Sequence, residues 1–313
     1  MNENTNTLAV LTEREVAEEM AGEFEIAGIR EIACAKLVQK KKWYEGKPIV
    51  SMLLLGLIIA GCLNCSLIMT KDPLYLDLQN YNVPPNREFL FGTDTMGRDI
   101  FSMIWYGGRI SLFIGIVSTV ISTVIAVIFG AFSGSAPVWA DRFLMRLTEI
   151  LLSVPGLLAV IFMQAVLGEA NVFSISLVIG LTGWMSIAKV VRTEVRKFRS
   201  SEYVIAARCM GGNFFYILRR HLAPNFVSSI MFMVAMNVRS AIVAESTLSF
   251  MGIGLPVELI SWGSMLSLAE NALPTNSWWM ILIPGAFLIV TLLCITDLGN
   301  YLRKNVNRRE SNL

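Results

Sequence analysis

Residues 110–140 read ISLFIGIVSTVISTVIAVIFGAFSGSAPVWA, a stretch without a single charged side chain. An α-helix crosses the hydrocarbon core of a bilayer, about 30 Å thick, with about 20 apolar residues. The chain of 313 residues is 54% hydrophobic and only 16% charged, whereas soluble domains carry about 25% charged residues. This stretch and the composition together predict an integral membrane protein.

Other charge-free runs extend the same pattern along the chain. They occupy 49–69, 150–168, 170–188 and 272–296, and a further run at 222–244 is apolar apart from Arg239. A charged side chain inside a membrane is costly and needs a reason. We predict an all-α, polytopic membrane protein with about six transmembrane helices, at 49–69, 110–133, 148–168, 171–190, 224–245 and 279–300.

Basic residues alternate between the two sides of these spans. They precede the first span, lie between spans two and three and between spans four and five, and follow the sixth, while 247–277 contains no Lys or Arg. Because Lys and Arg concentrate in cytoplasmic loops, we expect cytoplasmic termini, including a tail at 306–313. Residues 1–47 carry a capping-box pattern from Thr12 to Glu15, which predicts an amphipathic cytoplasmic helix lying on membrane lipid; a frayed tail is the alternative.

Several other kinds of site are disfavoured. A net charge of +2, with the basic residues beside the spans, does not indicate a nucleic-acid partner. Cys62 and Cys65 lie inside the first span, where small apolar fillers are commoner than a redox or metal site. No phosphate-binding loop, carboxylate pair or activated nucleophile is visible. We expect no catalytic residue, metal site or cofactor in this chain, and we reject a lipoprotein signal ending at Cys62 because the run begins too late.

Two segments between spans contain most of the functional information. The outer one, 70–108, is rich in turn-forming residues and predicts an ordered cap rather than a linker. The inner one, 191–223, predicts two short helices separated by a glycine break. The small residues Ala206, Ala207 and Gly211 would leave one helical face nearly bare, and such a face would suit docking into a groove on a soluble partner.

These segments also carry a family resemblance. The pattern Tyr203-Val204-x-Ala206-Ala207-Arg208-x-x-Gly211, closed by Arg220-His221-x-x-Pro224-Asn225, resembles the signature loop of ATP-binding-cassette importer permeases. The outer pattern Gly92-Thr93-Asp94-x-x-Gly97-Arg98-Asp99 resembles C-type permease subunits of dipeptide and oligopeptide importers. A third match runs from Glu245 to Gly254 and on to Arg303, so the resemblance covers about residues 45–305. Ile205, Ala223 and Asn300 depart from the family's usual residues.

The resemblance implies a type I importer permease fold in a bacterial inner membrane. It implies a second, similar permease, two ATPase subunits that bind ATP and Mg²⁺, and an extracytoplasmic substrate-binding protein as partners. Closure of the ATPases would move the docking loop and tilt the attached spans. The residues that it assigns to ATPase docking are Glu202, Tyr203, Ala206, Ala207, Arg208, Gly211, Gly212, His221 and Pro224.

Single residues in these segments allow two interpretations. Gly211 either permits a coupling turn or is only a helix C-cap, and His221 is a docking residue rather than a pH switch or metal ligand.

Arg239, Glu245, Trp262 and Met265 are candidates for the pathway or its gate. Arg239 either faces the pathway or a partner permease, or snorkels to the surface; it is six residues from Glu245, so each needs its own partner. Trp278 and Trp279 are predicted interface anchors.

The leading function is therefore a channel-forming subunit of a dipeptide or oligopeptide importer. The closest alternative is the same machine importing nickel or a metal chelate, which this sequence does not distinguish. An ion-coupled carrier would require inverted repeats and buried ionisable residues near the membrane centre, and a membrane enzyme would require a catalytic constellation. Neither pattern is visible.

Overall fold

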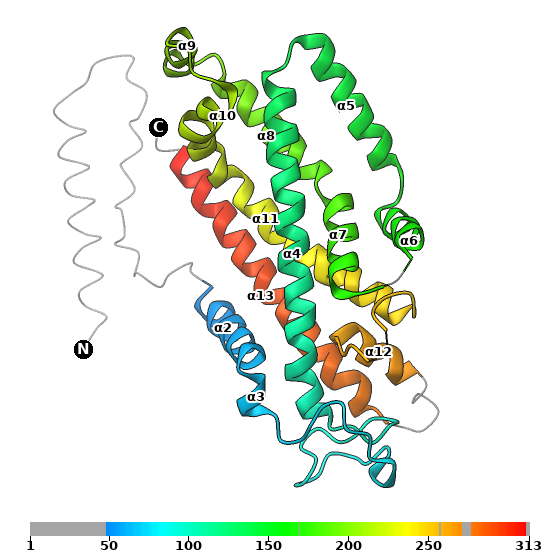
Figure 1. Ribbon diagram of the computed structural model, residues 1–313. Coiled ribbons are helices and arrows are strands. Elements are labelled where there is room, and N and C mark those ends of the chain that lie inside the picture. The colour runs from blue at the N-terminus through cyan, green and yellow to red at the C-terminus, as the bar shows by residue number, and fades with distance from the viewer. Residues whose placement is uncertain (1–47, 169, 257, 271–276, 311–313) are drawn as a thin grey trace, which may run out of the picture. The chain divides into compact units, whose positions relative to one another are not determined.

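The computed structural model describes residues 48–168, 170–256, 258–270 and 277–310 (Figure 1). The predicted amphipathic segment 1–47 and the last three residues of the predicted tail lie outside this part. The described residues form helices and connecting loops without a β-strand, apart from one isolated bridge between Thr93 and Asp99.

The six predicted spans correspond to helices or pairs of helices. Three helices are long and apolar enough to cross a membrane: α4 (Ile100–Ser135), α11 (Ala223–Phe250) and α13 (Trp279–Glu310). Two further candidate spans are bent pairs, α5 (Val138–Ser153) with α6 (Gly156–Leu167), and α7 (Val172–Gly183) with α8 (Met185–Phe198). The first span is α2 (Ile49–Leu63), a shorter apolar helix, continued by α3 (Cys65–Ile68). The chain is an all-α polytopic membrane protein, as predicted.

The helix boundaries differ from the predicted spans in informative ways. Helix α4 begins ten residues early, because Asp99 caps it by accepting a hydrogen bond from Ser102 N–H. The third span bends by 90° between α5 and α6, where Pro155 disfavours helical geometry at Val154. Helix α13 continues to Glu310, so residues 306–310 extend a helix instead of forming a separate tail.

Helix α4 lies at the centre of the bundle and contacts α2, α7, α8 and α11. Its close packing against α8 depends on small residues, since a Cβ atom at Gly130 would lie 2.5 Å from the carbonyl oxygen of Ala188. Small residues at helix contacts are typical of membrane bundles, where backbones approach closely.

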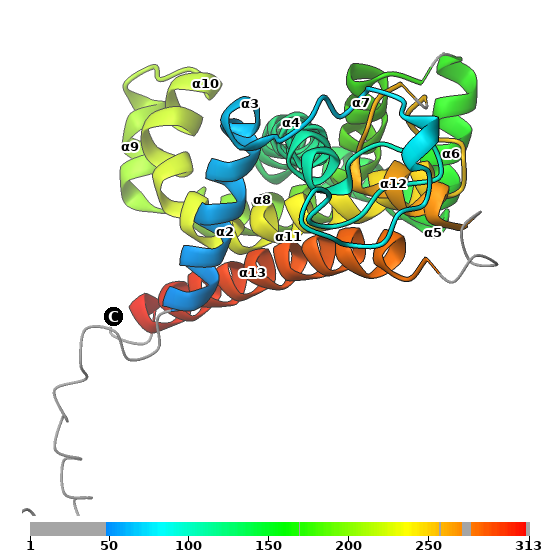
Figure 2. The same cartoon turned by 90° about the horizontal axis from the view of Figure 1, so that it is seen from below.

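The two ends of the bundle differ in structure. One end carries the turn between α4 and α5 together with two short helices, α9 (Glu202–Cys209) and α10 (Phe214–Ile217) (Figure 1). The other end carries the segment 70–99, with a short 3₁₀ turn η1 (Leu78–Asn80), and a short helix α12 (Trp262–Glu270) that the sequence did not predict (Figure 2). The candidate sites lie at these two ends and in the core between them.

Candidate functional site

Helices α9 and α10 build the segment that the sequence assigned to docking. The inner face of α9 is formed by Val204 and Ala207, which are buried. These side chains join a hydrophobic cluster with Ile217, Leu222 and Phe226 and with residues of α4 and α8. This segment is thus packed onto the membrane helices rather than connected to them by a loose loop.

A glycine turn separates the two short helices, as predicted. Gly211 has a φ of +84°, the left-handed conformation that favours glycine. The N–H of Gly212 donates to the carbonyl oxygen of Ala207 at 2.9 Å, which is the characteristic bond of a Schellman motif. Asn213 then caps α10 by accepting a hydrogen bond from Tyr216 N–H at 2.8 Å. Gly211 therefore ends α9 as a C-cap, and its role in coupling stays a prediction.

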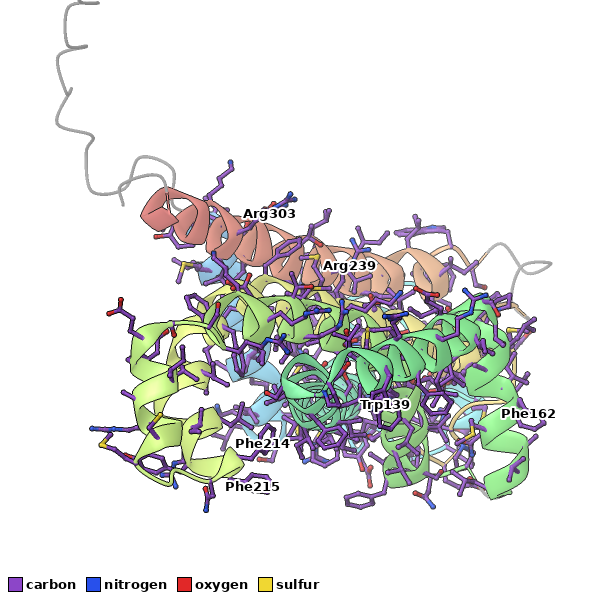
Figure 3. The ribbon with its side chains drawn as sticks, turned by 90° about the horizontal axis from the view of Figure 1, so that it is seen from above. Trp139, Phe162, Phe214, Phe215, Arg239 and Arg303 are labelled. Atoms are coloured by element: carbon purple, nitrogen blue, oxygen red, sulfur yellow. The ribbon has the colours of Figure 1, made fainter. Side chains whose placement is uncertain are left out.

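The outer surface of these two helices is apolar and largely exposed. We call it the α9–α10 face, and Figure 3 labels Phe214 and Phe215 within this element. Its large side chains and their exposed fractions are Tyr203 42%, Ile205 50%, Met210 82%, Phe215 68% and Tyr216 54%.

The small residues that were predicted to form one bare face do not all lie on the same side of α9. Ala206 is exposed, but Ala207 points into the core. The surface left for a partner therefore contains large apolar side chains beside the small residues Ala206 and Gly211. Glu202 and Gly211 are exposed beside it, and the side chains of Arg208, His221 and Pro224 lie outside the described part of the chain.

A π-helix connects this element directly to the fifth span. The π-helix η2 (Leu218–Leu222) follows α10 without a break and leads into α11. Its residues Leu218 and Leu222 are buried. Single π-turns are rare and occur frequently at functional sites. No pattern in the sequence predicted this element.

A second unpredicted feature lies at the same end of the bundle. Asp141, at the start of α5, is buried and receives hydrogen bonds from three side chains. Ser133 Oγ donates to it at 2.7 Å, Arg192 Nε at 2.6 Å and Arg196 at 2.7 Å. This network fastens α8 to the α4–α5 turn. In the sequence, this network is indicated by Asp141, an acidic residue in the otherwise basic connection between the second and third spans.

At the opposite end, the outer motif forms a closed network. Asp94 and Arg98 make an ion pair of 2.7 Å, and both side chains are almost fully buried. Asp94 also accepts hydrogen bonds from the N–H groups of Met96 and Arg98, each at 2.8 Å. Gly97 has a φ of +76°, and a Cβ atom there would lie 1.8 Å from the carbonyl oxygen of Asp77.

The remaining motif residues attach this network to the bundle. Thr93 Oγ1 donates to Asn80 O at 2.6 Å, and the indole of Trp279 donates to Thr93 O at 3.1 Å. Asp99 accepts a hydrogen bond from Thr70 Oγ1 at 2.9 Å. Gly92 turns the chain with a φ of +77°. Trp279 is buried here and holds the segment in place, so our interpretation of it as an interface anchor was wrong, whereas Trp278 is 53% exposed.

Three of the four pathway candidates meet in the core beneath this segment. Glu245 is fully buried and accepts hydrogen bonds from Ser111 at 3.1 Å and Ser249 at 3.0 Å. Ser111 Oγ also accepts from the backbone N–H of Trp262 at 3.2 Å. Trp262 is buried and donates its indole N–H to Ile104 O at 3.1 Å, and Met265 is buried on the same helix. These contacts fix α12 against α4 and α11.

Arg239 lies apart from this cluster. It is exposed on α11 (Figure 3), and its guanidinium donates a hydrogen bond of 3.4 Å to Thr296 Oγ1 on α13. Arg239 and Glu245 have different partners, as their spacing predicted. Among the described residues, no three His, Cys, Asp or Glu side chains gather as metal ligands would, and Cys62 and Cys65 are both buried in the core.

Comparison with known proteins gives a consistent result. A family model described as "Binding-protein-dependent transport system inner membrane component" matches residues 126–311. The oligopeptide transport system permease protein OppC of Bacillus subtilis is 35% identical over 256 residues, which cover 81% of this chain and 83% of that protein. The dipeptide transport system permease protein DppC of Bacillus subtilis is 37% identical over 229 residues, covering 72% and 70%. A putative peptide permease protein of Brucella suis is 32% identical over 256 residues, covering 82% and 84%.

Proposed function

Because this chain belongs to the binding-protein-dependent transport system inner membrane components, as a C-type permease of peptide importers, we propose that it forms part of the channel of an ATP-driven importer of dipeptides or oligopeptides. The energy comes from separate ATPase subunits that bind ATP and Mg²⁺. A second, similar permease completes the channel, and an extracytoplasmic binding protein delivers the peptide. The end with α9 and both termini face the cytoplasm of a bacterial cell.

The observation that carries the coupling proposal is the α9–α10 face. Met210 and Phe215 expose 82% and 68% of their side chains, although both lie on an element whose inner side is packed into the bundle. Exposed apolar patches of this kind mark protein–protein interaction sites. We assign this face, with Glu202, Tyr203, Ala206 and Gly211 in it, to the groove of an ATPase subunit.

The same contacts suggest how movement of the ATPase would reach the channel. Val204 and Ala207 connect α9 to the cluster shared with α4 and α8, and η2 continues into α11. A displacement of the short helices therefore tilts α8 and α11 as rigid bodies, which is the usual form of such transitions. Arg239 on α11 then faces the second permease or the pathway, and unchanged transport by an Arg239→Ala variant would contradict this assignment.

The coupling proposal can be tested with two matched double variants. In Met210→Ser/Phe215→Ser, the apolar anchors of the proposed docking face are removed, and we expect retention of the ATPase subunits on purification to fall roughly tenfold or more. Peptide uptake should fall with it, while the amount of inserted chain stays unchanged. Tyr75→Ser/Leu78→Ser is the control, because these residues are similarly exposed at the opposite end, 65% and 76%. Full ATPase retention in the first variant would rule out docking through this face.

The cargo is tested separately, by uptake in cells with and without the gene. A labelled short peptide is supplied beside labelled nickel, with and without a chelator. We expect the loss of peptide uptake alone. Loss of metal uptake alone would leave the coupling proposal in place and replace the peptide by a metal complex.

A further inference from the structure

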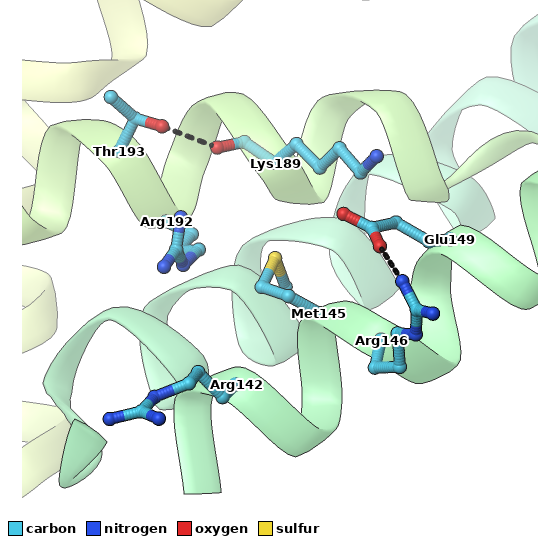
Figure 4. A pocket seen from close by; sticks show the side chains of 7 residues that line it. All are labelled: Arg142, Met145, Arg146, Glu149, Lys189, Arg192 and Thr193. Carbon is cyan, nitrogen blue, oxygen red and sulfur yellow. Dashed lines mark hydrogen bonds and ion pairs between the residues drawn. The ribbon is translucent and has the colours of Figure 1, made fainter. Parts of the chain in front are cut away.

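A cationic groove lies between α5 and α8, outside the α9–α10 face. It has a volume of about 620 Å³ and an open mouth (Figure 4). Its lining residues are Arg142, Met145, Arg146, Glu149, Lys189, Arg192 and Thr193. Four of these side chains are cationic and one is acidic, so the groove has an excess of positive charge.

The positive charge is only partly neutralised within the chain. Arg192 is occupied by Asp141, and Arg146 makes an exposed pair with Glu149 at 3.4 Å, a type of contact that contributes little. Among the residues that the structure describes, no carboxylate lies within ion-pair distance of Arg142 or Lys189. Two cations without an ion-pair partner in the described part of the chain, one from each helix, therefore border the same groove.

An apolar stripe runs along α5 beside the groove. Trp139, Phe143, Leu147 and Ile150 recur at spacings of three to four residues, so they share one face of the helix. They are exposed by 74%, 67%, 42% and 59%, and Figure 3 labels Trp139 at the start of α5. The groove residues Arg142 and Arg146 precede Phe143 and Leu147 by one position, which places the cationic and apolar faces next to each other.

We propose that this groove binds the headgroup of an anionic phospholipid, with the acyl chains lying along the apolar stripe of α5. The phosphate is held by Arg142 and Lys189, as basic pockets between membrane helices hold lipid headgroups. Trp139 fits the boundary between headgroups and hydrocarbon, where tryptophan is enriched. A soluble phosphate would occupy the groove but leave the apolar stripe of α5 uncovered. An acidic protein segment could bind the two cations, but it would not need an apolar stripe beside them that continues into the bilayer.

Native mass spectrometry of the assembled transporter tests the proposal. The complex is released from vesicles of phosphatidylcholine and phosphatidylglycerol, and the affinity for each lipid is compared. We expect the unaltered complex to prefer phosphatidylglycerol, and Arg142→Gln/Lys189→Gln to lose about fivefold in that preference for each charge removed. Both residues lie on the surface of the groove, and neither belongs to the buried Asp141 network.

The control variant is Arg303→Gln/Lys304→Gln. It also removes two exposed positive charges, from the C-terminal part of α13 (Figure 3), and we expect its lipid preference to stay unchanged. Equal losses in both double variants would mean a general effect of charge and would overturn the site.

Three other outcomes would also overturn the proposal. The first is displacement of the lipid by inorganic phosphate, which indicates a soluble-anion site. The second is the absence of a phosphatidylglycerol preference in the unaltered complex. The third is cross-linking of the groove to an acidic segment of a partner subunit. The test does not depend on the cargo, so its failure is distinguishable from a failure of the proposed function.

Discussion

The buried polar residues of the segment 70–99 and the exposed apolar residues of the α9–α10 face lie at opposite ends of the bundle and make opposite kinds of contact. In the first, charged and polar groups are buried and bonded within the chain, as Asp94 and Arg98 are. In the second, large apolar side chains such as Met210 and Phe215 remain exposed. A buried polar group needs a partner to avoid a desolvation cost, whereas an exposed apolar patch indicates a partner outside the chain.

This difference separates stability from function. Substitutions of the buried polar residues in the segment 70–99 should lower the stability of the chain itself. Substitutions of the exposed apolar side chains on the α9–α10 face should leave stability nearly unchanged and weaken the proposed contact with the ATPase. Three pairs of variants test the stability side of this contrast.

The largest effect is expected for Asp94→Ala. Removing one partner of a buried ion pair leaves the other charge uncompensated and costs about 3–5 kcal/mol. Asp94 also accepts two backbone hydrogen bonds that the variant would lose. Thermal unfolding of the purified protein in detergent should show a much lower midpoint.

The exposed pair Lys71–Glu88 in the same segment provides the control. Its atoms are 2.7 Å apart, but the side chains are 36% and 68% exposed, and exposed pairs contribute about 0–1 kcal/mol. Glu88→Gln should therefore change the unfolding midpoint little. Equal effects of the two variants would contradict the view that burial of the first pair matters.

A smaller difference is expected between two glycines with the same backbone conformation. Gly97 and Gly211 have φ values of +76° and +84°, so alanine at either position costs about 1–2 kcal/mol in backbone strain. A Cβ atom at Gly97 would also collide with Asp77 O, whereas nothing lies within 4 Å of one at Gly211. In unfolding measurements, Gly97→Ala should be the more destabilising by more than about 1 kcal/mol; the reverse order would show that the α9–α10 turn is the tighter of the two.

The smallest effects concern the two helix caps. Asp99 caps α4 and also bonds Thr70, whereas Asn213 caps only the four-residue helix α10. Loss of an N-cap costs about 0.5–2 kcal/mol, and we expect Asp99→Ala at the upper end and Asn213→Ala at the lower. Hydrogen exchange should then rise locally at 214–217 in Asn213→Ala without a clear change in the unfolding midpoint. A lower midpoint for Asn213→Ala than for Asp99→Ala would reverse the contrast.

The predicted spans fall on apolar helices because charge-free length is a local property. It placed the start of the second span at residue 110, after Arg109, but the helix begins at Ile100. The guanidinium of Arg109 lies 4.8 Å from the ring of Tyr106 on the same helix, so a charge marked the end of the apolar run and not the end of the helix. The bend at Pro155 was readable from the proline but was not predicted.

Other features depend on contacts between distant residues. Helix α12 is fixed by the bonds from Trp262 to Ile104 and Ser111, more than a hundred residues earlier in the chain. The glycine turn of the docking segment was predictable from its local pattern, but the burial of Ala207 was not, because helical spacing defines a face without saying what covers it. The Asp141 network likewise joins residues from three helices.

The uninterrupted path from α10 through η2 into α11 has a mechanical consequence. From Phe214 to Phe250 the backbone remains helical, and α11 itself is roughly 42 Å long at about 1.5 Å per residue. Helix α10, which leads into α11 through η2, carries Phe215 of the exposed face, and the last turns of α11 carry Glu245 beneath the segment 70–99. Over such a length, a tilt of a few degrees at one end becomes a shift of several ångströms at the other. Force applied at one side of the membrane thus has a stiff lever arm to the opposite side.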